Sequence, residues 1–351
     1  MKNLSYELFS DVDKSDEFFE SLTTDYKEFP IWFAKKAKEG EKAYLYRHGG
    51  IQGFLYLKIE EGVVSDVIPS LPAGRHLKVG TFKINGHGTR LGQRFIKKIF
   101  DHALDSGVVD AYVTVFAKHA NLLRILKTYG FTEHGKKNSG NGEELVLVKD
   151  FKASAKDILL DYPRVSRKSK NAFLLAIYPE YHTQFLPDSK LNNESFDIVE
   201  DVSHANSIHK IYISGVAAAG KLERGDILVM YRTTDIPGKA HYRSVATSIC
   251  VVEETRKIGS FSTEREFIRY VRPYSVFKMP QLTEYYISKK RHIVIKFTYN
   301  IALAKRLIRK RLLEEVGLPA GGRRWDFLKL TGAQFDDIAD LGQINESYII
   351  D

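Results

Sequence analysis

HLKVGTFKINGHGTRLGQRFIKKIFDHALDS, residues 76–106, joins a strand to a helix through a glycine-bearing loop. HLKVGTFKI reads as a strand, and the apolar residues after Leu91 recur at helical spacing. Gly86, Gly88 and Gly92 lie between the two elements. Glycine lets the backbone approach a ligand closely, and the N–H groups at a helix start attract anions. The stretch therefore predicts a phosphate-binding loop; an ordinary connection with turn glycines is the alternative.

The first 150 residues alternate strands and helices around this stretch. Before it, the sequence predicts a strand at LSYELFS, helical segments broken near Pro30, and a hairpin that turns at Gly49-Gly50. After it, we expect a strand at VDAYVTVF, a helix at ANLLRILKTYG, and strands at FTEHGKK and EELVLVKDF. This order predicts an α+β domain in which helices flank a mixed sheet.

The composition changes after this domain. We expect a first domain at 1–152, a polar and basic linker at 153–172, and a second domain at 173–351, because 351 residues exceed one compact domain. The second half has strand-like runs at KIYIS, GDILVMYRT, HYRSVATSICVVEE and HIVIKFTYN, which favour a small β-barrel. IALAKRLIRKRLLEEVG predicts an amphipathic helix, and the remaining tail is expected to pack on the barrel.

Composition narrows the class of protein. Hydrophobic residues make up 43% and charged residues 28%, as in soluble globular domains, and no apolar run is long enough to span a bilayer. We therefore expect a cytoplasmic location and no membrane partner. Cys250 is alone and is expected to be a buried strand residue, and the scattered histidines predict no metal site. The formal charge of +9 favours an anionic partner.

The loop and its flanking elements resemble the GNAT superfamily of N-acetyltransferases. Its motif R/Q-x-x-G-x-G/A is approximated by residues 87–92, with His87 and Arg90 as departures, and Gly130-Phe131 resembles the superfamily's next conserved region. The resemblance implies acetyl-CoA as acyl donor, bound by the end of a strand and the loop after it. The implied cofactor-binding residues are Phe82, Lys83, Ile84, Gly88, Thr89, Arg90, Leu91, Gly92 and Gln93.

The same resemblance identifies catalytic residues less clearly. Many members use a tyrosine acid at the position that Leu126 holds here, so Tyr129 is only a weak substitute and a helix-end packing residue is the alternative. For the base, Glu60, Glu61 and Asp66 are near in sequence, but a solvated hairpin explains each of them more simply. We therefore predict no base from the sequence.

The second half resembles the PUA-like superfamily, which includes ASCH and EVE domains and typically binds RNA or modified bases. Ring stacking and polar edge contacts are what a base pocket needs. The residues that fit this role at two strand ends are Tyr231, Arg232, Arg243, Ser244 and Thr247, with a core tyrosine and a solvated arginine as the alternative. Basic clusters at 167–170, 289–291 and 305–311 also suit a nucleic acid, although solvated surface charge explains them equally well.

Together these features favour an acetyl-CoA-dependent N-acetyltransferase that acts on a primary amine and carries a nucleic-acid-binding module. Two alternatives stay open: a non-catalytic CoA-binding scaffold or sensor with a nucleic-acid reader, and an N-acetyltransferase for small molecules or peptides.

Overall fold

The computed structural model describes residues 4–85, 88–168, 170–189, 203–289, 293–320 and 325–350. The chain divides into two compact units, Met1–Asp161 and Tyr162–Asp351. The boundary between the units lies inside the predicted linker 153–172, and the predicted domain bounds remain a prediction. No helix within the described ranges is both long and apolar enough to cross a bilayer.

The first unit is built on one seven-stranded sheet, whose strand order is β1-β2-β3-β4-β5-β7-β6. All neighbouring strands are antiparallel except β4 and β5, which are parallel. The strands are β1 (Leu4–Leu8), β2 (Lys42–Arg47), β3 (Ile51–Val64), β4 (Leu71–Ile84), β5 (Asp110–Val115), β6 (Thr132–Ser139) and β7 (Gly142–Asp150).

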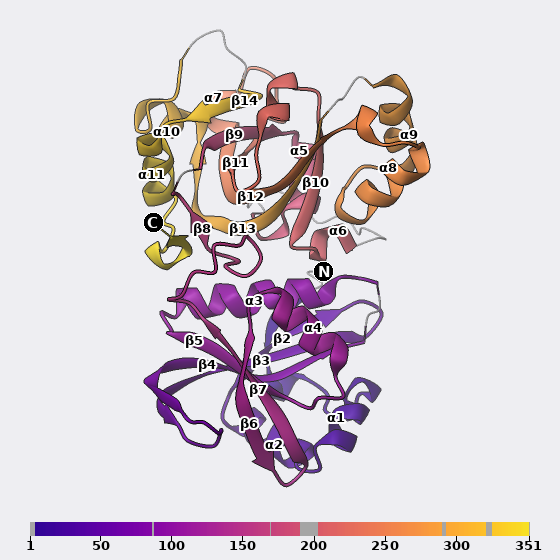
Figure 1. Cartoon of the computed structure of the whole chain (residues 1–351), viewed down its shortest axis with the longest axis vertical. Helices are drawn as coiled ribbons and strands as arrows, with labels where there is room; N and C mark the ends of the chain where they lie inside the picture. Colours follow the sequence, from indigo (N-terminus) through magenta and orange to yellow (C-terminus); the bar gives the residue numbers. More distant parts are fainter. Residues whose placement is uncertain are drawn as a thin grey trace. The chain divides into compact units, whose positions relative to one another are not determined.

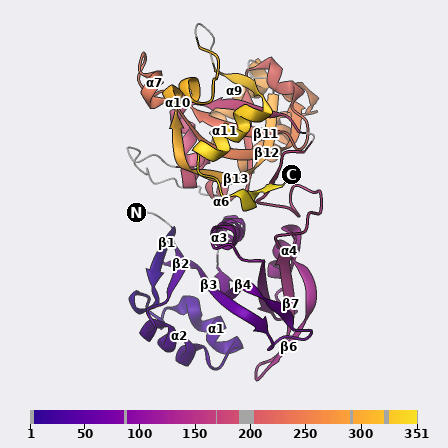
Figure 2. The same cartoon turned by 90° about the vertical axis from the view of Figure 1, so that its left-hand side faces the viewer.

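Helices cover both faces of this sheet (Figure 1, Figure 2). Phe54 and Tyr56 of β3 pack into one cluster with phenylalanines of the first helices, whereas Gly53 faces Phe95 on the other side. The strand side chains thus alternate between two apolar layers. The helices are α1 (Glu20–Asp25) and α2 (Phe29–Lys38) on the first face, and α3 (Leu91–Asp105) and α4 (Ala120–Thr128) on the second.

The second unit contains a six-stranded mixed sheet, ordered β10-β13-β12-β11-β9-β14, and a short pair β15-β8. The pairing of β12 with β13 is interrupted by three register shifts, which increase twist and bend the sheet. The strands are β8 (Val165–Ser166), β9 (Ala172–Ile177), β10 (His209–Ser214), β11 (Ile227–Arg232), β12 (Val245–Lys257), β13 (Ile293–Ile308), β14 (Phe327–Leu330) and β15 (Ile349–Ile350).

The helices of the second unit lie mainly at its sides, with α8 next to α9 and with α10 and α11 together on the other side (Figure 1). They are α5 (Pro179–Phe185), α6 (Ser203–Asn206), α7 (Ala240–Arg243), α8 (Glu264–Val271), α9 (Met279–Ser288), α10 (Arg309–Glu314) and α11 (Gly332–Leu341). The α+β class is confirmed. The end strands β10 and β14 do not pair within the described residues, so no closed barrel is seen there.

Two local predictions for the second half were wrong. The helix predicted from Ile301 is strand as far as Ile308, and α10 begins only at Arg309. The reason is long-range pairing, because Ile301–Ile308 lie against the start of β12. Lys305 and Arg306 therefore do not stack on a helix with Arg309 and Lys310. The strand predicted from His241 begins instead at Val245, after the short helix α7. Cys250 is buried in β12, as predicted.

Candidate functional site

Strands β4 and β5 separate partway along their length. His76–Val79 pair with Asp110–Val113, and within the described residues no β5 partner follows Val79. On its other edge β4 stays paired with β3 as far as Ile84. The edge of β4 that faces away from β3 is thus open from Gly80 to Ile84, and its backbone groups can pair with an extended ligand.

A β-bulge marks the point of separation. Tyr56 pairs with Thr81 and Leu57 with Val79, so Gly80 is the extra residue of β4. A Cβ atom at Gly80 would lie 2.7 Å from Cδ1 of Tyr56, closer than side chains tolerate. Tyr56 therefore restricts this position to glycine, and the bulge bends β4 where β5 leaves it.

The connection from β4 to α3 leads directly from this open edge. Gly88 has φ of +78°, a conformation that favours glycine, and Arg90 caps α3 in the left-handed region with φ of 57°. The cap has no side-chain hydrogen bond, and the first turn of α3 contains no acidic residue. The N–H of Gln93 donates to the carbonyl of Arg90 at 2.9 Å, and the N–H groups that precede it are of the kind that favours an anion at a helix start. Gly86 and His87 lie outside the described residues.

The remaining predicted cofactor-binding residues gather around the same edge, but their side chains differ in direction. Phe82 packs edge-on against Phe95, with ring centroids 5.7 Å apart. Lys83 turns to the other face and donates to Ser21 Oγ at 2.6 Å and to the carbonyl of Phe18. Its ammonium group is therefore engaged within the fold. The side chains at the helix start are buried (Leu91) or half-buried (Thr89, Arg90, Gln93), and a Cβ at Gly92 would lie 2.8 Å from Ile125.

The predicted acid Tyr129 lies at the C-terminal end of α4, the end that does not follow β5. It caps the C-terminus of α4 and is 1% exposed, within the core of the unit. Because α4 starts just after β5 ends and runs for nine residues, its two ends are about 13 Å apart. Leu126, at the position where the superfamily often has tyrosine, is fully buried. This geometry adds no support for Tyr129 as an acid.

A buried pair that sequence reasoning missed lies on the sheet face covered by α1 and α2. Tyr112 of β5 donates a hydrogen bond to the Glu60 carboxylate of β3, and Lys58 lies 2.9 Å from the same carboxylate. Glu60 is thus not the solvated hairpin residue that we expected. Alternation in β3 and β5 places both side chains on one face, but the contact passes over β4 and has no local sequence signal.

The surroundings of this pair lower the pKa of Glu60 and raise the pKa of Tyr112. Burial alone would raise the pKa of Glu60, but the hydrogen bonds from Tyr112 and Lys58 outweigh burial and hold that pKa below its ordinary value. Burial and the adjacent carboxylate raise the pKa of Tyr112 well above its ordinary value. At neutral pH, Glu60 is therefore an acceptor and Tyr112 a donor.

A cavity of about 500 Å³ lies at the end of β5, lined in part by Asp25, Phe116 and Asn141. Asp25 accepts a 2.6 Å hydrogen bond from Lys118, and Asn141 donates to both carboxylate oxygens of Glu28 at 2.8 Å. The described lining thus combines the aromatic ring of Phe116 with one carboxylate, Asp25, and with two lysines, Lys27 and Lys118. Within the described residues, no group of three or more His, Cys, Asp or Glu side chains could hold a metal ion.

In the second unit, Tyr231 is buried and does not present its ring to solvent. It is 2% exposed and packs against Trp325 with ring centroids 5.5 Å apart. The Arg309 guanidinium lies 4.0 Å from the Trp325 centroid and donates to the Tyr231 hydroxyl at 3.5 Å. Tyr231 belongs to a structural stack in this conformation.

The predicted arginines differ in exposure. Arg232 is 4% exposed and donates to the carbonyls of Thr233 and Arg243. The Arg243 side chain reaches the surface, where it forms a two-pronged pair with Asp235 at 2.5 and 2.6 Å. Ser244, the cap of α7, is buried. Arg243 is therefore the predicted nucleic-acid residue that a partner reaches most easily.

Thr247 belongs to a chain of buried hydroxyl groups. Its Oγ1 lies 2.8 Å from Nε2 of His182 and 3.1 Å from Oγ of Ser248. Ser189 continues the chain, 2.8 Å from Ser248 and 2.8 Å from the hydroxyl of Tyr299. The hydroxyl groups of this chain satisfy one another, which is the condition for burying them without a large penalty, and Nε2 of His182 joins the chain at one end.

Comparisons with known proteins find no matching family model and no matching curated protein. The similar solved structures are of two kinds. One is an ASCH protein from Zymomonas mobilis, with 9% identity and a TM-score of 0.32 over 48% of this chain and 94% of that one. The other kind is acetyltransferases. A GNAT family acetyltransferase from Elizabethkingia anophelis with acetyl-CoA bound has 10% identity and a TM-score of 0.30, over 43% and 99%.

The N-acetyltransferase PseH from Campylobacter jejuni is a second acetyltransferase of this set, with 14% identity and a TM-score of 0.27 over 42% of this chain and 98% of that one. Likenesses at these scores do not establish the chemistry of this chain. The residues and geometry described above carry the functional argument instead.

Proposed function

We propose that this chain is an acyl-CoA-dependent N-acyltransferase with acetyl-CoA as donor, and that its second unit binds RNA or another nucleic acid. The observation that supports the first part is the open edge of β4, which is followed along the chain by α3, whose cap residue Arg90 makes no side-chain hydrogen bond. An extended amide-bearing arm pairs with Gly80–Ile84, and a pyrophosphate accepts hydrogen bonds from the first turn of α3.

Acyl transfer needs an amine held near the thioester and a path for its proton. In this proposal the cavity beside Phe116 and Asp25 receives the amine, since it lies at the end of β5. Glu60 is kept ionised by Tyr112 and Lys58, but Tyr112 lies four residues before Phe116, about 13 Å along the strand, so the proton reaches Glu60 only through a chain of waters. The amine nitrogen then bonds to the acyl carbon as the carbon–sulfur bond breaks, and the thiolate of CoA leaves and takes up a proton.

Calorimetric titration with acetyl-CoA and CoA tests the binding step. Arg90→Glu places a negative charge at the start of α3, where it repels the pyrophosphate, and should weaken CoA binding about tenfold or more. Lys38→Glu makes the same change of net charge at the exposed end of α2 and should leave binding unchanged. Wild-type protein that binds neither acetyl-CoA nor CoA would contradict the proposal.

A non-catalytic CoA sensor is the second candidate, favoured by buried Leu126 at the superfamily's acid position and by the remote place of Tyr129. Release of free thiol from acetyl-CoA, measured with a cell extract as the source of amines, separates the two. Thiol release that depends on extract and falls in Glu60→Gln supports the enzyme. CoA binding without any thiol release supports the sensor.

A further inference from the structure

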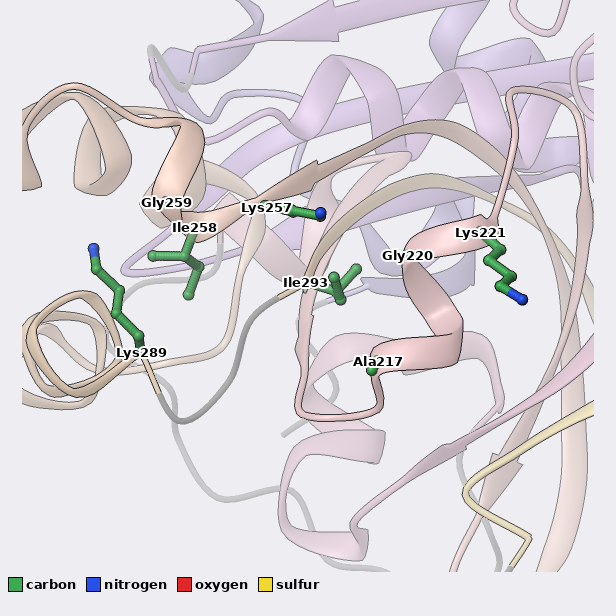
Figure 3. Close-up of a pocket in the computed structure, with 8 residues that line it drawn as sticks. All are labelled: Ala217, Gly220, Lys221, Lys257, Ile258, Gly259, Lys289 and Ile293. Atoms are coloured by element: carbon green, nitrogen blue, oxygen red, sulfur yellow. The ribbon is translucent and has the colours of Figure 1, made fainter.

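A second cavity, of about 570 Å³, lies in the second unit, and its lining includes none of the residues predicted for a base pocket, although Lys289 belongs to the predicted basic cluster 289–291 (Figure 3). Three lysines line it: Lys221 at the end of the turn 217–221, Lys257 at the end of β12, and Lys289 at the end of α9. Ile258 and Ile293 lie between them (Figure 3). We call this cavity the lysine pocket.

The lysines of this pocket are not neutralised. None of the three has an acidic partner among the described residues. Lys289 instead lies 3.5 Å from the ring centroid of Tyr286. By contrast, Lys296 of β13 forms an ion pair with Glu253 at 3.1 Å. Three like charges around one cavity repel one another, and a bound polyanion offsets that repulsion.

The floor of the pocket is apolar and shaped by glycine. A Cβ at Gly220 would lie 3.0 Å from Cδ1 of Ile293, so a larger residue there would press on the floor. Gly259 has open space around the position of a Cβ, at the edge of the cavity. The pocket therefore offers ammonium groups around an apolar surface, which matches a ligand with phosphates attached to less polar groups.

The distribution of charge indicates a polymer. Residues 162–351 contain 29 Lys and Arg against 22 Asp and Glu, a net charge of +7, whereas residues 1–161 contain 24 against 22. A small phosphate compound needs only the pocket, but a strand of phosphates also interacts with the positive net charge of the unit.

We propose that the lysine pocket holds the backbone of a single-stranded nucleic acid, with phosphates at Lys221, Lys257 and Lys289 and a sugar or base face on Ile258 and Ile293. This inference rests on the proposed nucleic-acid role of the second unit and specifies its site.

Fluorescence anisotropy with a labelled oligouridine strand tests the site on the full chain. Changing all three pocket lysines to glutamine should lower affinity at least about tenfold, and should reduce the slope of log affinity against log salt by about 2, because each phosphate contact contributes about 0.7. The matched control changes three other exposed lysines of the same unit to glutamine, namely Lys239, Lys278 and Lys329, which lie outside the predicted basic clusters, and should have little effect.

Gly259→Leu provides a second variant that fills the pocket without changing charge. This variant should weaken oligonucleotide binding and leave the slope of log affinity against log salt nearly unchanged. Circular dichroism on each variant monitors the fold.

Three results would overturn the proposal: no oligonucleotide binding at low salt, equal losses in the pocket and control triples, or tripolyphosphate binding with the same lysine dependence while the oligonucleotide does not bind. Acetyl-CoA titration on the same variants keeps the questions separate. If a variant loses oligonucleotide binding but still binds CoA, the result bears on the lysine pocket. If the protein does not bind CoA, the result bears only on the acyltransferase proposal.

Discussion

The open edge of β4 and the buried hydroxyl chain around Thr247 are two polar regions with opposite character. At the edge, β5 does not pair with Gly80–Ile84, and α3 follows this segment along the chain with a cap residue that makes no side-chain hydrogen bond. Around Thr247, the hydroxyl groups of Ser248, Ser189 and Tyr299 form a continuous buried chain that Nε2 of His182 joins. Backbone groups on an open strand edge can pair with a ligand, whereas side chains that pair with each other hold the structure together.

The largest effect that tests this contrast is expected at Tyr231. Tyr231→Ala removes a buried ring from Trp325 and Arg309, and should lower the free energy of unfolding by about 3–5 kcal/mol. Tyr231→Phe keeps the packing and should change stability and oligonucleotide binding little. Urea unfolding and anisotropy measure both. A large binding loss in a stable Tyr231→Phe variant would show that the hydroxyl contacts the nucleic acid.

The hydroxyl chain gives the next effect. Thr247→Val keeps the shape of the side chain but leaves Nε2 of His182 without the Thr247 hydroxyl, and should destabilise the protein by about 1–3 kcal/mol. Oligonucleotide affinity, measured at a temperature where the variant is folded, should be unchanged. If affinity falls while stability does not, the chain is a binding surface and the contrast with the β4 edge fails.

The ionisation of Glu60 makes both the stability of the first unit and the proposed catalysis depend on pH. Its pKa is lowered in the folded protein, so its ionised form stabilises the fold above the unfolded-state pKa, and that contribution is lost as the pH falls through the folded-state pKa. Glu60→Gln should therefore reduce stability at pH 7 and have less effect near pH 3, as thermal unfolding will show. For catalysis, loss of activity with a midpoint near pH 6 or above would exclude Glu60 as the titrating group.

The smallest effect is expected at the exposed pair of Asp235 and Arg243. The Arg243 hydrogen bond lowers the pKa of Asp235 to about 2. Because both groups are exposed, Asp235→Asn should change the melting temperature by an amount near the limit of measurement. It also releases the Arg243 guanidinium and should raise oligonucleotide affinity slightly. An unchanged affinity would indicate that Arg243 is not near the bound strand.

Local patterns predicted most elements of the first unit, including the strand, loop and helix at 76–106, because alternation and helical spacing are short-range signals. They failed at Ile301–Ile308. The run IALAKRLI fits both periods, and only its pairing with Val245–Ile249 selects a strand. The elements that bear the candidate sites were thus easier to predict than the long strands that connect distant parts of the sheet.

The site residues divide in the same way. The loop glycines carry a local signal, whereas the contact between Tyr112 and Glu60 and the meeting of Lys221, Lys257 and Lys289 join separate elements. Burial is also invisible in a short motif. Tyr231 and Thr247 have the right chemistry for a base pocket but are placed in the interior by packing around Trp325 and His182.

At the end of the paired segment farthest from the opening, the facing residues His76 and Asp110 form a buried contact. Nδ1 of His76 lies 2.8 Å from Oδ1 of Asp110, and Nε2 donates to the carbonyl of Pro72 at 2.9 Å. This contact holds β4 against β5 at the start of the paired segment. The pairing ends at Val79, and the opening begins at Gly80. From Gly80 to Ile84 an extended strand spans about 16 Å. The length of the open edge thus limits the ligand. An extended arm of about 16 Å can pair along all of Gly80–Ile84, and the rest of a longer arm lies beyond it.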